Sequence, residues 1–217
     1  MTYKTAIFDL DGTLLDTLDD LRDAVNATLS RYGYPPRTQE DIRRFVGNGV
    51  RSLVALSLPC GEDTPDFEKI LADFRTYYAA HAEIKTAPYE GVRDLLARLR
   101  AHGLRVAVVS NKFEAAVQAL CRRYFGDLVE VAVGDDPSRA RKPAPDGVFA
   151  ALAALGEGVD GAVYIGDAET DVETARAAGI PCLSVLWGFR DRARLIEVGA
   201  TCFAETAAEL EKILLGA

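Results

Sequence analysis

The chain has 217 residues, 49% of them hydrophobic, which suffices for one large domain or for an ordinary domain with a smaller companion. Its 33 acidic and 25 basic residues give a formal charge of −8, so most of the surface should repel nucleic acid and anionic membranes. The longest unbroken apolar run, residues 148–155, is far shorter than the roughly 20 residues that span a bilayer.

Two further features bear on where the protein works. Acidic residues follow the start of the chain too closely for a signal peptide. The four cysteines are far apart and form no CxxC pair, which disfavours a zinc site and indicates reduced thiols. We therefore expect a cytoplasmic protein, monomeric or homodimeric, without nucleic-acid or membrane partners. An anionic ligand would need a local cluster of cations, metal or backbone N–H groups.

Short apolar runs alternate with amphipathic stretches along most of the chain. Strands are predicted at residues 3–9, 104–110, 128–134, 161–167, 180–186 and 200–203. Helices are predicted near residues 91–102, 113–125, 145–155, 169–178, 191–197 and 206–215. This alternation is typical of parallel βαβ units, in which helices cover both faces of the sheet.

Residues 17–86 follow a different pattern, with helical periodicity and no strand candidate. One apolar stripe begins at Leu18 and a second at Phe67, while Thr38 and Asp41 have the spacing of a capping box. We expect two domains: an α/β core of residues 1–16 and 87–217, and an all-helical domain of residues 17–86 inserted after the first strand.

The segment FDLDGTLLD places Asp9 and Asp11 at the end of the first apolar strand. A β-hairpin with Asp11-Gly12 in its turn is disfavoured because the following residues have helical periodicity. A calcium-binding EF-hand is disfavoured because Leu14 and Asp20 occupy the positions that require Gly and Glu. The remaining interpretation is that both carboxylates lie at the carboxyl edge of a parallel sheet, where such sheets bind ligands.

Reactive side chains follow other predicted strands as well. Ser110 and Asn111 end one strand, Asp167 ends another with Asp171 close behind, and Lys142 lies in a loop between strands. Each alone has a local explanation, since Ser-Asn and Gly-Asp are ordinary turn formers. Together they predict a single polar site at one edge of the sheet.

The segments DLDGTLLD, SNK, KPAPD and GDAETD resemble the four ordered motifs of the haloacid dehalogenase superfamily. The helical insert is similar to that family's small cap domain. VGNGVRSLV and VLWGFR resemble the phosphoglycolate phosphatase branch. The resemblance covers essentially the whole chain and implies a doubly wound, mostly parallel α/β core with an inserted helical cap. Asp11 distinguishes the chain from the metal-independent dehalogenases, which lack this second acid, and argues for phosphoryl transfer.

The resemblance implies distinct roles for the acids of these motifs. Asp9 is the expected nucleophile, which would form an aspartyl-phosphate, and Asp11 is the expected general acid and base. A hard cation such as Mg²⁺ prefers oxygen ligands, so Asp9, Asp167 and the backbone carbonyl of Asp11 are its expected ligands. Asp171 would bind the metal directly or orient a bound water, unless it is a solvent-facing residue of a first helical turn.

Other residues are expected to hold the phosphoryl group. Ser110, the Asn111 N–H and Lys142 would bind its oxygens, and the N–H groups of Gly12 and Thr13 would face it. Lys112 adjoins the second motif and is expected to be a surface charge.

Residues that select the substrate are expected in the helical cap. Arg51 would bind a substrate carboxylate, together with Arg43, Arg44 and Asn48, although a solvated basic helix face explains them as well. His81 is expected to pack within its helix. In the core, Arg190 is expected to approach the site from the loop after the fifth strand.

The expected function is Mg²⁺-dependent hydrolysis of a small phosphorylated metabolite, with 2-phosphoglycolate as the first candidate. The alternatives are a pyrophosphatase, a nucleotide or sugar-phosphate phosphatase, a phosphomutase like β-phosphoglucomutase, and a non-catalytic binding protein on the same fold.

Overall fold

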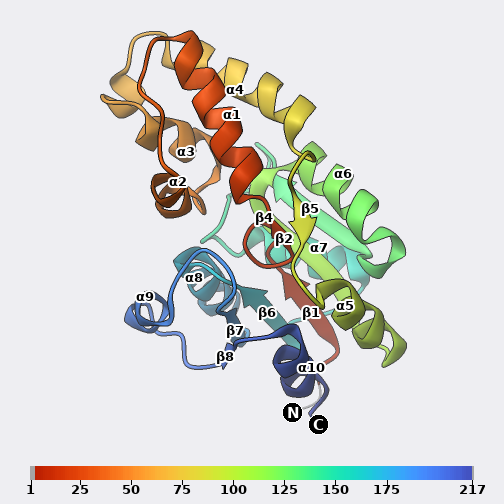
Figure 1. Cartoon of the computed structure of the whole chain (residues 1–217). Helices are drawn as coiled ribbons and strands as arrows, with labels where there is room; N and C mark the ends of the chain where they lie inside the picture. Colours follow the sequence, from red (N-terminus) through yellow and green to blue (C-terminus); the bar gives the residue numbers. More distant parts are fainter. Residues whose placement is uncertain (1–2, 217) are drawn as a thin grey trace. The chain divides into compact units, whose positions relative to one another are not determined.

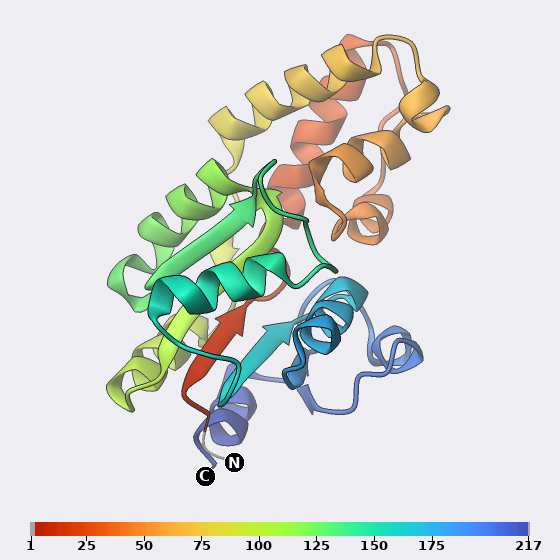
Figure 2. The ribbon, with the colours of Figure 1, turned by 180° about the vertical axis from the view of Figure 1, so that it is seen from behind.

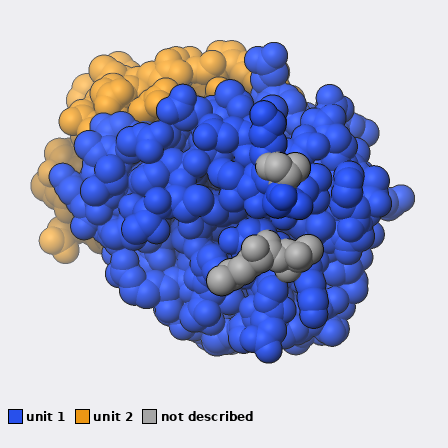
Figure 3. Space-filling model, turned by 90° about the horizontal axis from the view of Figure 1, so that it is seen from below, with its two compact units in different colours: residues 1–15, 88–217 blue, residues 16–87 orange. Residues whose placement is uncertain are grey.

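The computed structural model of the protein describes residues 3–216. The chain forms two compact units, one made of the segments up to Leu15 and from Pro88 onward, the other of Asp16–Ala87 (Figure 3). That the first unit is a catalytic core and the second a substrate-selecting cap stays a prediction. Within residues 3–216, no helix has the length and apolar composition needed to cross a membrane.

The first unit contains a six-stranded sheet in the order β5-β4-β1-β6-β7-β8, and every neighbouring pair is parallel (Figure 1). Its strands are β1 (Thr5–Phe8), β4 (Arg105–Phe113), β5 (Val131–Asp135), β6 (Ala162–Gly166), β7 (Cys182–Val185) and β8 (Phe203–Ala204). Every predicted strand overlaps one of these six, so the expected mostly parallel α/β sheet is confirmed.

Helices cover both faces of this sheet (Figures 1 and 2). They are α5 (Val92–Ala101), α6 (Glu114–Tyr124), α7 (Asp146–Leu155), α8 (Glu169–Ala178), α9 (Arg192–Glu197) and α10 (Ala207–Leu215), with a 3₁₀ turn η2 (Gly126–Leu128). Alternation along β1 explains the two layers: Phe8 packs into the core beneath α5, α6 and α10, whereas Ile7 packs into the core beneath α7 and α8. Burial on both faces requires the continuous apolar runs seen in the sequence.

The order of the strands determines where in the sheet a ligand site can form. From β1 the chain adds β4 and β5 on one side, then returns to add β6, β7 and β8 on the other. In register, Phe8 lies beside Val108 of β4 and Ile165 of β6. The carboxyl ends of β1, β4 and β6 therefore adjoin at the point where the strand order reverses, which is where open parallel sheets bind ligands.

The second unit is helical, with α1 (Leu18–Arg31), α2 (Gln39–Phe45), α3 (Gly49–Ser57), a 3₁₀ turn η1 (Gly61–Asp63) and α4 (Phe67–His81). The predicted capping box is confirmed: Thr38 Oγ1 accepts the Asp41 N–H at 3.1 Å, and the Asp41 carboxylate accepts the Thr38 N–H at 3.1 Å. Phe74 and Tyr78 of the second predicted stripe are fully buried and stack with centroids 5.7 Å apart.

Two short strands escaped the sequence analysis, namely β2 (Leu15–Asp16) and β3 (Ala87–Pro88), which pair with each other where the chain passes between the units. Within the second unit, Asp20 of α1 is 3% exposed. Its carboxylate accepts the backbone N–H of Lys85 at 3.0 Å and that of Thr86 at 2.8 Å. Asp20 thus links the start of α1 to the segment that leaves the second unit.

Candidate active site

Asp9 directly follows β1, and its backbone N–H continues the ladder by donating to Ile165 O at 2.8 Å. This bond fixes the backbone, so the side chain leaves at the carboxyl edge of the sheet. Asp9 is 7% exposed, and its Oδ1 lies 3.0 Å from Nζ of Lys142. Despite this ion pair, Asp9 Oδ1 accepts no well-formed hydrogen bond from residues 3–216.

Lys142 is buried between two acids, Asp9 and Asp171. Its Nζ contacts Asp171 Oδ1 at 2.7 Å and lies 5.6 Å from the ring centroid of Tyr164. Burial opposes its charge, but Asp171 and Asp9 outweigh burial and hold the pKa of Lys142 well above its usual value. Lys142 is therefore a fixed cation beside Asp9.

Asp171 is fully buried and so is not the solvent-facing residue that was kept as an alternative. Its Oδ2 accepts the backbone N–H groups of Asp167 at 3.0 Å and Ala168 at 2.9 Å, while Oδ1 is bound to Lys142. Both oxygens are engaged, which favours an orienting role over direct metal ligation.

Asp167 directly follows β6 and is also fully buried. Its Oδ1 accepts the hydroxyl of Thr13 at 2.9 Å, and its Oδ2 accepts the backbone N–H of Phe189 at 2.8 Å. Each oxygen keeps further lone pairs. Neither contact supplies a full positive charge, so the Asp167 carboxylate is held in place without being neutralised.

The cluster is short of positive charge. Asp9, Asp11, Asp167 and Asp171 face two ammonium groups, Lys112 and Lys142, which leaves a formal −2 among these six side chains. Burial, opposed by Lys142, raises the pKa of Asp9 to about 7. Burial together with Asp171 and Asp9 raises the pKa of Asp167 to about 8. A divalent cation would supply the charge that is missing.

The donor set suits such a cation. Oxygen atoms of Asp9, Asp167 and Asp171 lie within 4.8 Å of one another, and oxygen donors favour hard ions such as Mg²⁺. With Asp171 engaged elsewhere, Asp9 and Asp167 fit best as carboxylate ligands. The carbonyl of Asp11 as a ligand stays a prediction.

Gly12 and Thr13 require a correction. Their N–H groups were expected to face phosphate, but Gly12 N–H donates to Leu15 O at 2.9 Å and Thr13 N–H to Leu10 O at 3.3 Å. Gly12 has φ +87°, and a Cβ there would overlap the Asp167 carboxylate. These residues thus shape the turn and the Asp167 site, with Thr13 contributing its hydroxyl.

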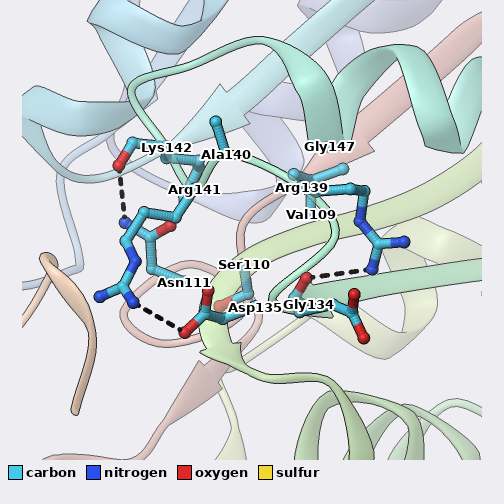
Figure 4. Close-up of a pocket in the computed structure, with 11 residues that line it drawn as sticks. Val109, Ser110, Asn111, Gly134, Asp135, Arg139, Ala140, Arg141, Lys142 and Gly147 are labelled. Atoms are coloured by element: carbon cyan, nitrogen blue, oxygen red, sulfur yellow. Dashed lines mark hydrogen bonds and ion pairs between the residues drawn. The ribbon is translucent and has the colours of Figure 1, made fainter. Parts of the chain in front are cut away.

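Ser110 and Asn111 lie in β4 where its register against β5 shifts, between Val109 and Phe113. Both are buried, and Asn111 Nδ2 donates to Lys142 O at 3.1 Å, which anchors the loop that carries the lysine. Figure 4 shows Ser110, Asn111 and Lys142 lining one pocket of the first unit. The structure brings the second and third motifs together, as the sequence predicted, although phosphate binding itself stays a prediction.

Lys112 was wrongly expected to be a surface charge. It is 4% exposed, and its Nζ contacts both carboxylate oxygens of Asp11, at 2.9 and 3.0 Å. The expectation failed because SNK reads locally as a turn, whereas the residue continues β4 inward through the register shift.

Candidate substrate residues are held by other side chains. Arg51 Nη2 pairs with Glu62 at 2.6 Å and Glu68 at 2.7 Å, which favours the solvated, ion-paired alternative for this helix face. His81 packs on Tyr77 within α4 with ring centroids 4.0 Å apart, as expected. Arg190 Nε pairs with Glu169 at 2.9 Å. Substrate binding by Arg51 and Arg190 stays a prediction.

Two positioning residues escaped the sequence analysis. Besides the Phe189 N–H, Trp187 Nε1 donates to Thr13 O at 3.0 Å, so the loop after β7 braces the turn after β1. Gly188 between them allows this approach, because a Cβ there would overlap Asp167 and the Gly12 carbonyl.

Comparisons with known proteins agree with this geometry. A phosphoglycolate phosphatase from Rhodospirillum rubrum is 35% identical over 215 residues, 95% of this chain and 89% of that protein. An N-acetylmuramic acid 6-phosphate phosphatase from Pseudomonas aeruginosa is 32% identical over 190 residues, 87% of this chain and 84% of that protein. A crystal structure from Lactobacillus delbrueckii subsp. bulgaricus matches with TM-score 0.95 and 38% identity over 100% of both chains.

The match to a family is equally extensive. Residues 6–185, which contain all four motifs, match the haloacid dehalogenase-like hydrolases. The resemblance inferred from the motifs is confirmed. The chain belongs to the haloacid dehalogenase-like hydrolase family.

Proposed function

We propose that this protein is a Mg²⁺-dependent phosphatase of small phosphomonoesters that works through an aspartyl-phosphate on Asp9. The observation that carries the proposal is the pairing of Asp9 with Lys142 inside a cluster that has more carboxylates than cations. A dianionic phosphate resists attack by a carboxylate unless cations neutralise both groups. The cluster offers one fixed ammonium and a set of oxygen donors for a metal.

The chemistry follows from the side chains. An Asp9 oxygen forms a bond to phosphorus while the bond from phosphorus to the leaving oxygen breaks, and Asp11 gives its proton to that oxygen. A water molecule then attacks phosphorus and passes one proton to Asp11. Inorganic phosphate leaves and Asp9 is restored. Lys142, aligned by Asp171, stabilises the charge on the transferring oxygens.

Asp9 and Asp167 would hold the metal, which when bound supplies charge neutralisation of both the carboxylate and the phosphate. Thr13 and Phe189 keep Asp167 in place for this purpose. Ser110 and the Asn111 N–H would complete the phosphate site from β4.

2-Phosphoglycolate is the first candidate substrate, because a relative of 35% identity is named a phosphoglycolate phosphatase. A sugar phosphate is the second, because another relative is named an N-acetylmuramic acid 6-phosphate phosphatase. A panel of 2-phosphoglycolate, N-acetylmuramic acid 6-phosphate, hexose phosphates, nucleotides and pyrophosphate, ranked by kcat/KM, decides among them. Phosphate release without an added bisphosphate excludes a mutase that needs such a cofactor. We propose that the enzyme is cytoplasmic and that its substrate is a small phosphorylated metabolite.

The Asp9→Asn variant tests the mechanism. With Mg²⁺ and an aryl phosphate, we expect turnover to fall by about 10⁴-fold or more, because the nucleophile is gone. Rapid quenching of the wild-type enzyme with labelled substrate should yield an acid-stable, hydroxylamine-sensitive acyl phosphate that the variant lacks. Turnover by a folded Asp9→Asn protein would remove Asp9 from this role.

A further inference from the structure

The ion pair between Lys112 and Asp11 is not explained by packing alone. Lys112 has a side chain that is 2% exposed, and Asp11 has one that is 14% exposed. Moving an ammonium group out of water is costly, and a close carboxylate offsets that cost only when the geometry is good. Nζ of Lys112 lies 2.9 and 3.0 Å from the two oxygens of Asp11, so it fixes the carboxylate at both ends.

The local structure explains how a lysine reaches this place. Lys112 lies in β4 within the segment where the register against β5 shifts. Its backbone N–H turns toward Ser110 Oγ at 3.3 Å. Ser110 and Lys112, two residues apart in β4, are both buried, as expected for residues on one face of a strand.

Asp9 and Asp11 pair with different lysines of the cluster. Lys142 pairs with Asp9 at 3.0 Å, and Lys112 pairs with Asp11 at 2.9 Å, from two separate segments of the chain. The two carboxylates are similarly buried, with side chains 10% exposed for Asp9 and 14% exposed for Asp11. Each acid with a proposed chemical task thus has its own cationic partner.

We propose that Lys112 is a positioning residue that holds the Asp11 carboxylate in the orientation required to pass a proton to the leaving oxygen. This inference rests on the proposed function, in which Asp11 is the general acid. Lys112 acts through Asp11 and forms no bond to the substrate.

The experiment compares two kinds of leaving group. In Lys112→Met, a substitution of similar length without charge, we expect kcat/KM for the best alkyl phosphate of the panel to fall by about 30-fold or more, since general acid catalysis supplies about 10²–10⁴. For 2,4-dinitrophenyl phosphate, whose leaving group needs no proton, the fall should be less than about 3-fold. kcat/KM is the appropriate readout because it extends only to the first irreversible step, phosphoryl transfer to Asp9.

The double variant Asp11→Asn with Lys112→Met shows whether Lys112 acts through Asp11. If it does, the double variant loses no more kcat/KM on the alkyl phosphate than Asp11→Asn alone. Additive losses, or equal losses on both substrates in Lys112→Met, would overturn the proposal and leave Lys112 a structural residue. Lys112→Gln, which retains a donor, should recover part of the alkyl-phosphate activity and guards against misfolding of the methionine variant.

If the proposed role of Asp11 is itself wrong, the variants will give a different set of results. If Asp11→Asn itself shows no selective loss on the alkyl phosphate, Asp11 is not the acid and the proposed mechanism is wrong at that residue. If Asp11→Asn shows the selective loss and Lys112→Met does not, only the assignment of Lys112 fails.

Discussion

Two regions of this molecule bury aspartates in opposite ways. Asp20 in the helical unit is 3% exposed, and backbone N–H groups of Lys85 and Thr86 satisfy both of its oxygens. Asp9 in the α/β unit is 7% exposed, yet its Oδ1 accepts no hydrogen bond of good geometry from the described part of the chain. The Asp20 carboxylate stabilises the fold of its unit through hydrogen bonds. The Asp9 carboxylate needs more positive charge than Lys142 supplies.

The difference distinguishes a structural acid from a candidate functional one without reference to sequence motifs. Buried acids are usually paired or hydrogen-bonded because desolvation penalises the charge. Asp9 departs from this rule at one oxygen. Burial and the neighbouring Asp171 raise the pKa of both Asp9 and Asp167, and such perturbed acids are typical of a functional site. Substitutions in the two regions should therefore produce opposite changes in stability.

The larger effect is expected at Asp20. In Asp20→Asn an NH₂ group replaces one carboxylate oxygen, and the remaining oxygen, now uncharged, accepts the N–H groups of Lys85 and Thr86 more weakly. Hydrogen bonds to a charged group contribute about 1.5–3 kcal/mol and those to a neutral group about 0.5–1.5 kcal/mol, so we expect a loss of about 1–2 kcal/mol, or a fall in Tm of about 5 °C for a chain of this size. Differential scanning calorimetry of the wild-type protein and the Asp20→Asn variant measures this difference in Tm. An unchanged Tm would show that water reaches these donors and that the carboxylate is not a structural anchor.

The opposite change is expected at Asp9. In metal-free protein, Asp9→Asn should leave Tm unchanged or raise it by up to about 3 °C, because it removes a negative charge from a crowded, buried cluster. The same substitution should abolish turnover, and an unchanged Tm would then show that the loss of activity is not due to unfolding. A fall in Tm as large as that of Asp20→Asn would mean that Asp9 is stabilised as fully as Asp20, and the contrast would fail.

The sequence predicted Asp9, Ser110 and Asp167 as neighbours because parallel strands end at one edge of a sheet. That argument needs only strand order and apolar periodicity. It could not predict the partner of Lys112, because the direction of that side chain depends on a register shift between β4 and β5. It also missed the contact between Asp20 and Lys85, since no local pattern joins residues 65 apart. Long-range polar contacts depend on packing rather than on periodicity.

The smallest effect expected here is a pH dependence of the stabilisation by Mg²⁺. The pKa values of Asp9, about 7, and Asp167, about 8, lie above their ordinary value of 3.8. Between pH 4 and 8 the folded, metal-free protein therefore binds more protons than the unfolded chain, so its stability falls as pH rises through the pKa values of the folded state.

Mg²⁺ binds the ionised acids and competes with those protons. The rise in Tm on replacing EDTA by Mg²⁺ should accordingly be larger at pH 8 than at pH 5.5, by about 3 °C. Asp20→Asn should retain this pH dependence because its carboxylate lies outside the cluster, whereas Asp9→Asn should reduce it. A Mg²⁺ effect of equal size at both pH values would indicate that the ion binds exposed acids rather than this cluster. Loss of the dependence in Asp20→Asn alone would place the titrating groups in the helical unit.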